Sequence, residues 1–318
     1  MSGRVGVLVM AHGTPAAPAE IAAFYTRIRR GRPPTLEQLE ELEGRYAAIG
    51  GVSPLAERSR AQVEALRSAL DDRAPGRYEV AFGAKHTDPL IEQAAVTLAA
   101  TGVDRIVGLV LTPHGSSLGS AEYLERARAA LSLPVAFVEV PPWFGAPALV
   151  ALLAERVAQA ASGLADRGTP GRLTVIFTAH SLPERVRETG DTYPEQLEES
   201  ASLVAKAAGL ARWQVAWQSA GRTPEPWLSP DVRDLVRQLG AADGRDDFNG
   251  SLGADGVVIC PIGFVTDHLE VLYDLDVELA AVAAEVGLAF ARTASLNDDP
   301  GFIDVLADVI SAAEARRG

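Results

Sequence analysis

Short apolar runs alternate with helix-like stretches along almost the whole chain, and this alternation constrains the fold more than any other feature. The run Gly256–Cys260 (GVVIC) is apolar throughout, as a strand buried on both faces requires. Further short runs bounded by turn residues are expected to form strands at Val5–Met10, Tyr78–Phe82, Arg105–Leu111, Val135–Val140, Leu173–Thr178, Trp213–Trp217 and Leu288–Arg292.

The segments between these runs carry helical periodicity. Helices are expected at Glu20–Arg29, Leu36–Ile49, Leu55–Leu70, Leu90–Ala100, Leu118–Leu131, Pro147–Ala161, Pro194–Ala207 and Asp231–Leu239, with a closing helix from Pro300. Repeated strand–helix units predict parallel sheets with right-handed crossovers. The pattern restarts after the loop-like segment 163–171. We therefore predict an α/β fold of two doubly wound, Rossmann-like domains whose parallel sheets face a cleft.

The same pattern predicts the domain boundaries. We expect a first domain at residues 1–145 and a second at 146–292, and we expect the C-terminal helix of 293–318 to pack back on the first domain. The Gly- and Asp-rich stretch 240–255 is expected to be a surface insertion without a chemical role.

Charge and cysteine content exclude several classes of protein. The net charge of −13, with no basic stripe to balance it, argues against a nucleic-acid partner. The single Cys260 excludes an internal disulfide and an iron–sulfur cluster, which needs about four ligands. No stretch is judged long and apolar enough to span a bilayer, and the apolar run near the N-terminus is too short for a signal peptide. A cytoplasmic monomer is the expectation.

All five histidines follow a predicted strand: His12, His86, His114, His180 and His268. Ligands of parallel sheets bind beyond the carboxyl ends of the strands, so these imidazoles are expected at the cleft. A structural role is the simpler interpretation of any single histidine, but the set favours a ligand site. Imidazole beside carboxylates suits a divalent transition metal, and the spacing matches no closed zinc site.

Three carboxylates follow the strand Gly256–Cys260 at intervals of four residues. Glu270, Asp274 and Glu278 fall on one face of a helix-like segment that is expected to begin around Val265. Like charges at this spacing destabilise a helix by about a few tenths of a kcal/mol per pair. Local stability therefore does not explain the row, and we expect a cationic ligand there instead.

Four arginines lie close together in the segment RIRRGRPP, at 27–34. The simplest interpretation is a solvated helix end, where positive charge is favourable. In a chain of net charge −13, the cluster is also a candidate binding site for a ligand with several carboxylates, because guanidinium groups match carboxylate geometry.

Six motifs, in order along the chain, resemble the motif series of the ferrochelatases: AHGTP (11–15), IGGVSPL (49–55), GAKHTDPLIE (83–92), FTAHSLPE (177–184), WQSAGRTPEPWLSPD (217–231) and CPIGFVTDHLEVLYDLD (260–276). The segments RIRRGR and RYAAIGG resemble the coproporphyrin-using branch that is common in Gram-positive bacteria. That resemblance implies insertion of Fe(II) into coproporphyrin III to form coproheme, with release of two protons. The alternative substrate is protoporphyrin IX, which would give protoheme.

The resemblance also implies roles for individual residues. His180 and Glu270 would lie across from each other and form the catalytic pair that binds iron, and His268 would orient Glu270. Asp274 and Glu278 would extend Glu270 into a path for hydrated divalent cations, which a π-type bulge would align better than a regular helix. The residues expected to contact the porphyrin and its propionates are Arg29, Arg45, Tyr46, Ser53 and Tyr123.

The first motif departs from the coproporphyrin branch, which usually has a tyrosine as axial iron ligand at the position of His12. Imidazole also binds iron, so His12 is expected to be axial to the product iron. Fe(II) is then a substrate, and no iron–sulfur cluster is expected. A rival interpretation is a two-domain protein that closes on a metal or tetrapyrrole without performing chemistry.

Overall fold

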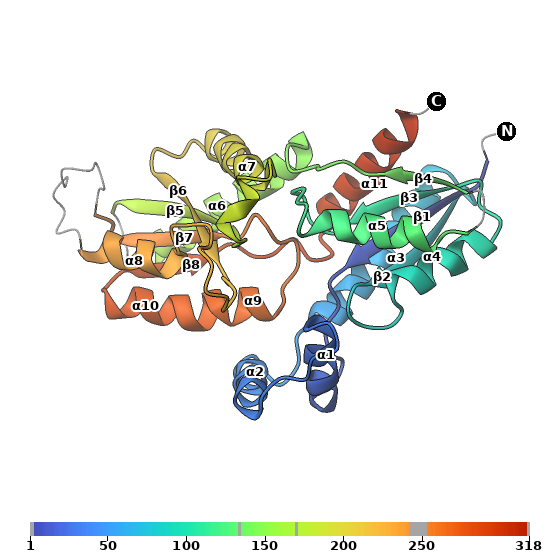
Figure 1. Cartoon of the computed structure of the whole chain (residues 1–318). Helices are drawn as coiled ribbons and strands as arrows, with labels where there is room; N and C mark the ends of the chain where they lie inside the picture. The colour runs from blue at the N-terminus through green and yellow to red at the C-terminus, as the bar shows by residue number, and fades with distance from the viewer. Residues whose placement is uncertain (1–2, 133–134, 169–170, 242–252, 317–318) are drawn as a thin grey trace. The chain divides into compact units, whose positions relative to one another are not determined.

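The computed structural model describes residues 3–132, 135–168, 171–241 and 253–316. It contains two four-stranded parallel sheets with flanking helices, which confirms the α/β prediction (Figure 1). One compact unit comprises Met1–Ala146, Val265–Leu269 and Leu296–Gly318, and the other comprises Pro147–Phe264 and Glu270–Ser295. Most of the predicted insertion 240–255 lies outside the described residues.

The sheet of the first unit has the strand order β2-β1-β3-β4. Its central strand β1 (Val5–Ala11) is buried at every position, because it pairs with a strand on each side and is covered on both faces. The other strands are β2 (Tyr78–Ala84), β3 (Arg105–Val110) and β4 (Ala136–Glu139).

Helices cover both faces of the first sheet. On one face, α4 (Ile91–Ala100) and α5 (Ser120–Ala130) form a core with Leu8 and Met10 of β1. On the other, α3 (Leu55–Arg73) packs against α11 (Pro300–Ala315) (Figure 1). The 3₁₀ turn Pro18–Glu20 leads into α1 (Ile21–Ile28), which packs against α2 (Leu36–Ala48).

The sheet of the second unit has the order β6-β5-β7-β8. Its strands are β5 (Leu173–His180), β6 (Trp213–Gln218), β7 (Gly256–Cys260) and β8 (Ala289–Arg292). All five residues of β7 are buried, as its continuous apolar run predicted. Burial raises the pKa of the Cys260 thiol to about 12, so this cysteine stays protonated.

Helices also cover both faces of the second sheet. One core joins Ile176, Val257 and Ile259 to α8 (Val232–Ala241) and α10 (Ala280–Glu285). Elsewhere α6 (Pro147–Asp166) packs against α7 (Tyr193–Ala207), β7 and β8, and a 3₁₀ turn, Glu184–Val186, follows β5.

Helix α6 (Pro147–Asp166) corrects the expectation that no stretch could span a bilayer, because its length and composition meet that criterion. Its large side chains Leu149, Leu153 and Val157 are spaced by four and are buried on one face. Small and polar side chains fill the exposed face, where alanines raise the hydropathy. This one-sided burial is the pattern of an amphipathic helix that packs on a sheet.

The segment after β7 also differs from its prediction. Helix α9 (Leu269–Leu272) begins four residues later than expected, because Asn297 ties the preceding segment down through bonds to Val265 O and Asp267 N. A π-helix then runs over Asp274–Leu279, with Glu278 N donating to Tyr273 O at 2.9 Å. The π-type bulge inferred from the carboxylate spacing is confirmed.

Candidate active site

The second sheet reverses its direction of growth between β5 and β7, because the chain passes from β5 to β6 on one side and then to β7 on the other. In doubly wound sheets, ligands bind at the carboxyl ends of the strands that flank such a switch point. His180 is the last residue of β5, and Glu270 lies in α9, which follows β7. Both residues thus come from elements that end or begin at this edge.

The side chains of His180 and Glu270 face each other. His180 Nε2 lies 3.7 Å from Glu270 Oε1, and each side chain is 36% exposed. His180 Nδ1 is within hydrogen-bonding distance of Ser181 O, a carbonyl that can only accept. Nδ1 therefore carries a hydrogen, and Nε2 is the ring nitrogen on the side of Glu270.

The backbone around His180 is held by buried partners. The hydroxyl of Tyr193 donates to His180 O at 3.0 Å, and Ser181 Oγ donates to Leu228 O at 3.0 Å. Burial, followed by the negative charge of Glu270, raises the pKa of Tyr193 above its usual value, so the phenol stays a donor.

The other two carboxylates of the acidic row lie in the π-helix. Asp274 is 8% exposed and accepts a hydrogen bond from the hydroxyl of Ser219, whose φ of 58° is in the left-handed region. Glu278 is half-buried. Asp276 lies off the row and forms an ion pair with Arg292, with Oδ1 2.7 Å from Nε.

A second group of candidates belongs to the first unit. His12 directly follows β1, which flanks the switch point of the first sheet, and its ring centroid lies 4.7 Å from that of His86. His12 Nδ1 is 3.1 Å from Gly13 O. Burial, then the proximity of His12 and of cations led by Lys85, lowers the pKa of His86 to about 3, which keeps His86 neutral.

Three of the predicted porphyrin-contacting residues are buried in the first unit. Tyr46 is 3% exposed and its hydroxyl lies 3.3 Å from Thr14 Oγ1, whereas Ser53 Oγ accepts a bond from Leu55 N. Tyr123 is 9% exposed, and the ammonium of Lys85 lies 5.1 Å from its ring centroid.

The two predicted arginines make contacts within the first unit. Arg29 lies over the ring of Tyr25 and donates to Arg32 O. Arg45 lies 3.6 Å from the carboxylate of Glu41, one helical turn earlier. Ion pairs of this exposed kind contribute about 0–1 kcal/mol, so a carboxylate ligand can compete for the guanidinium at small cost.

The remaining histidines differ from each other. His268 Nδ1 is 2.9 Å from Thr266 O, and both belong to the segment of the first unit that precedes Glu270. His114 is 2% exposed and stacks on Phe144, and burial lowers its pKa to about 3. His114 is therefore a core residue, and the expectation that all five histidines face a ligand is wrong for it.

Residues that support the pair were not predicted from the sequence. Tyr193, Gln218 and Ser219 all contact the elements that carry His180, Glu270 or Asp274. The one available signal was the motif WQSAG at the end of a predicted strand, where polar residues meet the ligand edge of the sheet.

The described residues contain no group of three or more His, Cys, Asp or Glu side chains that could hold a metal ion. His180 and Glu270 together offer one nitrogen and one oxygen donor. Donors that bind one ion at about 2.1 Å each lie about 3–4 Å apart, so the 3.7 Å spacing of this pair suits one shared ion.

The chain is similar to known proteins over nearly its whole length. The family model described as Ferrochelatase matches residues 4–314. Coproporphyrin III ferrochelatase from Geobacillus thermodenitrificans is 43% identical over 99% of this chain and 97% of its own. The protein of the same name from Bacillus subtilis is 39% identical over 96% and 97%. The solved structure of SirB from Bacillus subtilis with Fe3+ shares the fold, with a TM-score of 0.57, 12% identity and coverage of 99% and 97%.

Proposed function

Because this chain belongs to the ferrochelatase family, we propose that it is a lyase that inserts Fe(II) into coproporphyrin III, forming coproheme and releasing two protons. The observation that carries the proposal is the pair of His180 Nε2 and Glu270 Oε1, 3.7 Å apart at the switch point of the second sheet. Iron insertion requires a base for pyrrole protons and a ligand for iron, and this pair provides both types of group.

His180 is suited to accept a proton. Its Nδ1 hydrogen is engaged with Ser181 O, so only Nε2 can take a pyrrole proton or bind the metal. In the reaction two N–H bonds of the porphyrin break and two protons leave, while Fe(II) gains the ring nitrogens as ligands and loses water. Glu270 is suited to bind Fe(II) during this exchange and to offset its charge.

Each of the other predicted residues has a role in the proposed reaction. Asp274 and Glu278 supply hydrated divalent cations to Glu270, and His268 helps to orient Glu270. His12 is axial to the iron of the product. Arg29 and Arg45 bind propionates, with Tyr46, Ser53 and Tyr123 shaping the porphyrin site from within the first unit. Fe(II) is a substrate throughout, and no iron–sulfur cluster takes part.

One assay separates this function from its alternatives. The protein is incubated anaerobically with Fe(II) and either coproporphyrin III or protoporphyrin IX, and insertion is followed by absorption. We expect multiple turnovers, with a higher kcat/KM for coproporphyrin III. A preference for protoporphyrin IX would identify the alternative substrate, and product limited to one equivalent would indicate a carrier.

The variant His180→Ala tests the proposed base. Its kcat for iron insertion should fall by at least about a hundredfold, the usual contribution of a positioned general base. The Kd for coproporphyrin III, measured by fluorescence quenching, should change little, because burial and arginine contacts hold the porphyrin. Near-normal turnover would contradict the assignment of His180.

A further inference from the structure

A buried amide joins the strand that carries His180 to the helix that carries Glu270. Gln218, the last residue of β6, is 1% exposed. Its Nε2 donates to the carbonyl oxygen of Glu270 at 3.1 Å, and its Oε1 accepts from the hydroxyl of Thr178 in β5 at 2.8 Å. One side chain therefore bridges two elements that are far apart in the sequence.

The orientation of this amide is fixed by its partners. The carbonyl oxygen of Glu270 can only accept, so the NH₂ group must face it, and Oε1 must then face Thr178. In a flipped amide, Oε1 of Gln218 would face the carbonyl oxygen of Glu270, and both atoms are acceptors. Thr178 is fully buried, so water cannot replace the lost partner. Leaving a buried polar atom unpaired is costly, so the bridge has one stable arrangement.

The bridge acts close to both members of the candidate pair. Thr178 lies two residues before His180, and Gln218 is the register partner of His180 in β6. Gln218 O also accepts from Ser181 N at 2.7 Å. On the other side, the bond reaches Glu270 itself, in the first turn of a helical segment that continues through the π-helix into α10.

We propose that Gln218, held by Thr178, is a positioning residue that sets the distance between His180 Nε2 and Glu270 Oε1. It acts through the backbone of Glu270 and needs no contact with iron or porphyrin. Transfer of an ion between two donors depends steeply on their separation, and displacements near 1 Å can cost about a hundredfold in rate. The inference rests on the proposed function for its catalytic consequence, but the geometric role can be measured without turnover.

The test is Thr178→Val, which removes the hydroxyl at nearly constant volume and releases Oε1 of Gln218. We expect kcat for iron insertion to fall at least about tenfold, while the Kd for coproporphyrin III stays within about twofold. Thr178→Ser keeps the hydroxyl and should restore kcat to within about twofold of the original protein. Gln218→Met, which removes the bridge itself, should resemble Thr178→Val.

Thr174→Val is the matched control. Thr174 lies four residues earlier on the same strand and is 2% exposed, and its hydroxyl makes no hydrogen bond to any described residue. This variant should leave kcat unchanged. If it lowers kcat as much as Thr178→Val does, loss of packing in β5 explains the effect and the positioning role is overturned.

Cobalt(II) provides a readout that does not require turnover. Its affinity, followed by visible absorption, should fall at least about tenfold in Thr178→Val and Gln218→Met, because the two donors no longer share one ion well. The cobalt absorption that disappears in His180→Ala is the part that reports binding at the pair of His180 and Glu270. Unchanged cobalt affinity in both variants overturns the inference, whereas a protein that binds cobalt but inserts no iron contradicts the proposed function instead.

Discussion

At the residue scale, charge and partner decide what each carboxylate after β7 can do. Asp276 is paired with Arg292, so its charge is already balanced. Asp274 has a hydroxyl partner, Ser219, which fixes its orientation and leaves its negative charge in place. Asp274 and Glu278 both lie in the π-helix, so the row places two carboxylates beyond Glu270 along one helical segment.

The double variant Asp274→Asn, Glu278→Gln should raise the KM for Fe(II) and leave the KM for coproporphyrin III unchanged. The amides keep the shapes of the side chains but remove two charges that attract the cation. Steady-state kinetics at low ionic strength give both constants. Asp276→Asn, in the same helix but off the row, is the control and should not change the KM for Fe(II). An unaltered KM for Fe(II) in the double variant would contradict a role for Asp274 and Glu278 in supplying the cation, and the row would then be an ordinary solvated helix face.

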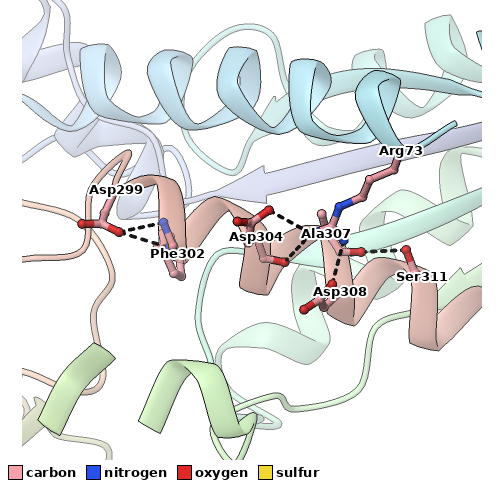
Figure 2. A network of polar contacts seen from close by, with 8 residues as sticks. Arg73, Asp299, Phe302, Asp304, Ala307, Asp308 and Ser311 are labelled. Carbon is pink, nitrogen blue, oxygen red and sulfur yellow. Dashed lines mark hydrogen bonds and ion pairs between the residues drawn. The ribbon is translucent and has the colours of Figure 1, made fainter. Parts of the chain in front are cut away.

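At the scale of elements, polar contacts fix the first turn of α11 and its packing against α3 within the first unit. Asp299 caps its first turn by accepting from the backbone N–H groups of Gly301 and Phe302. Arg73, at the end of α3, forms ion pairs with two carboxylates of α11 that are one turn apart (Figure 2). Its guanidinium nitrogens lie 2.9 Å from Asp304 Oδ1 and 2.7 Å from Asp308 Oδ1. One guanidinium thus joins two helices separated by most of the chain.

Arg73→Met should lower the free energy of unfolding by about 1 kcal/mol, because two exposed ion pairs are lost while the aliphatic stem is kept. Both carboxylates are about two-thirds exposed, so the loss should shrink at high salt. Urea denaturation at low and high ionic strength measures both effects. Arg60→Met is the control, because Arg60 lies on the same helix and its side chain bonds to Ala56 O. Equal losses in the two variants would rule out the network as the cause.

At the scale of the whole molecule, each unit has its own sheet and core, and protonation of a core residue is coupled to unfolding. His114 is buried in the first unit with its pKa near 3, whereas an unfolded histidine has a pKa near 6.5. Between these values the unfolded chain binds a proton that the folded protein does not. The free energy of unfolding is therefore unaffected above about pH 6.5 and falls as the pH drops toward 3.

His114→Phe should remove this part of the acid sensitivity. The contribution approaches about 1.4 kcal/mol per pH unit in that range, and phenylalanine can keep the stacking on Phe144. Urea midpoints of the variant and the original protein, compared at pH 7 and pH 5, isolate the histidine because all other groups are shared. Parallel pH dependences would show that His114 does not titrate on unfolding.

The sequence alone determined the order of strands and helices to within a few residues, because burial on one or both faces leaves a periodic pattern that is local. It also predicted the candidate pair, because the motifs place an imidazole and a carboxylate after two predicted strands. Strand order put His180 and Glu270 at one edge, and their 3.7 Å separation was visible only in the structure.

The tertiary structure decided which polar residues are buried and what they hold. Helix α9 begins at Leu269 because Asn297, 30 residues beyond Asp267, binds the segment before it. His114 belongs to the core, and Gln218 bridges Thr178 and Glu270. Such contacts depend on strand register and on the packing of helices onto sheets. Neither leaves a periodic mark in the sequence, because each bond joins residues that become neighbours only when the chain has folded.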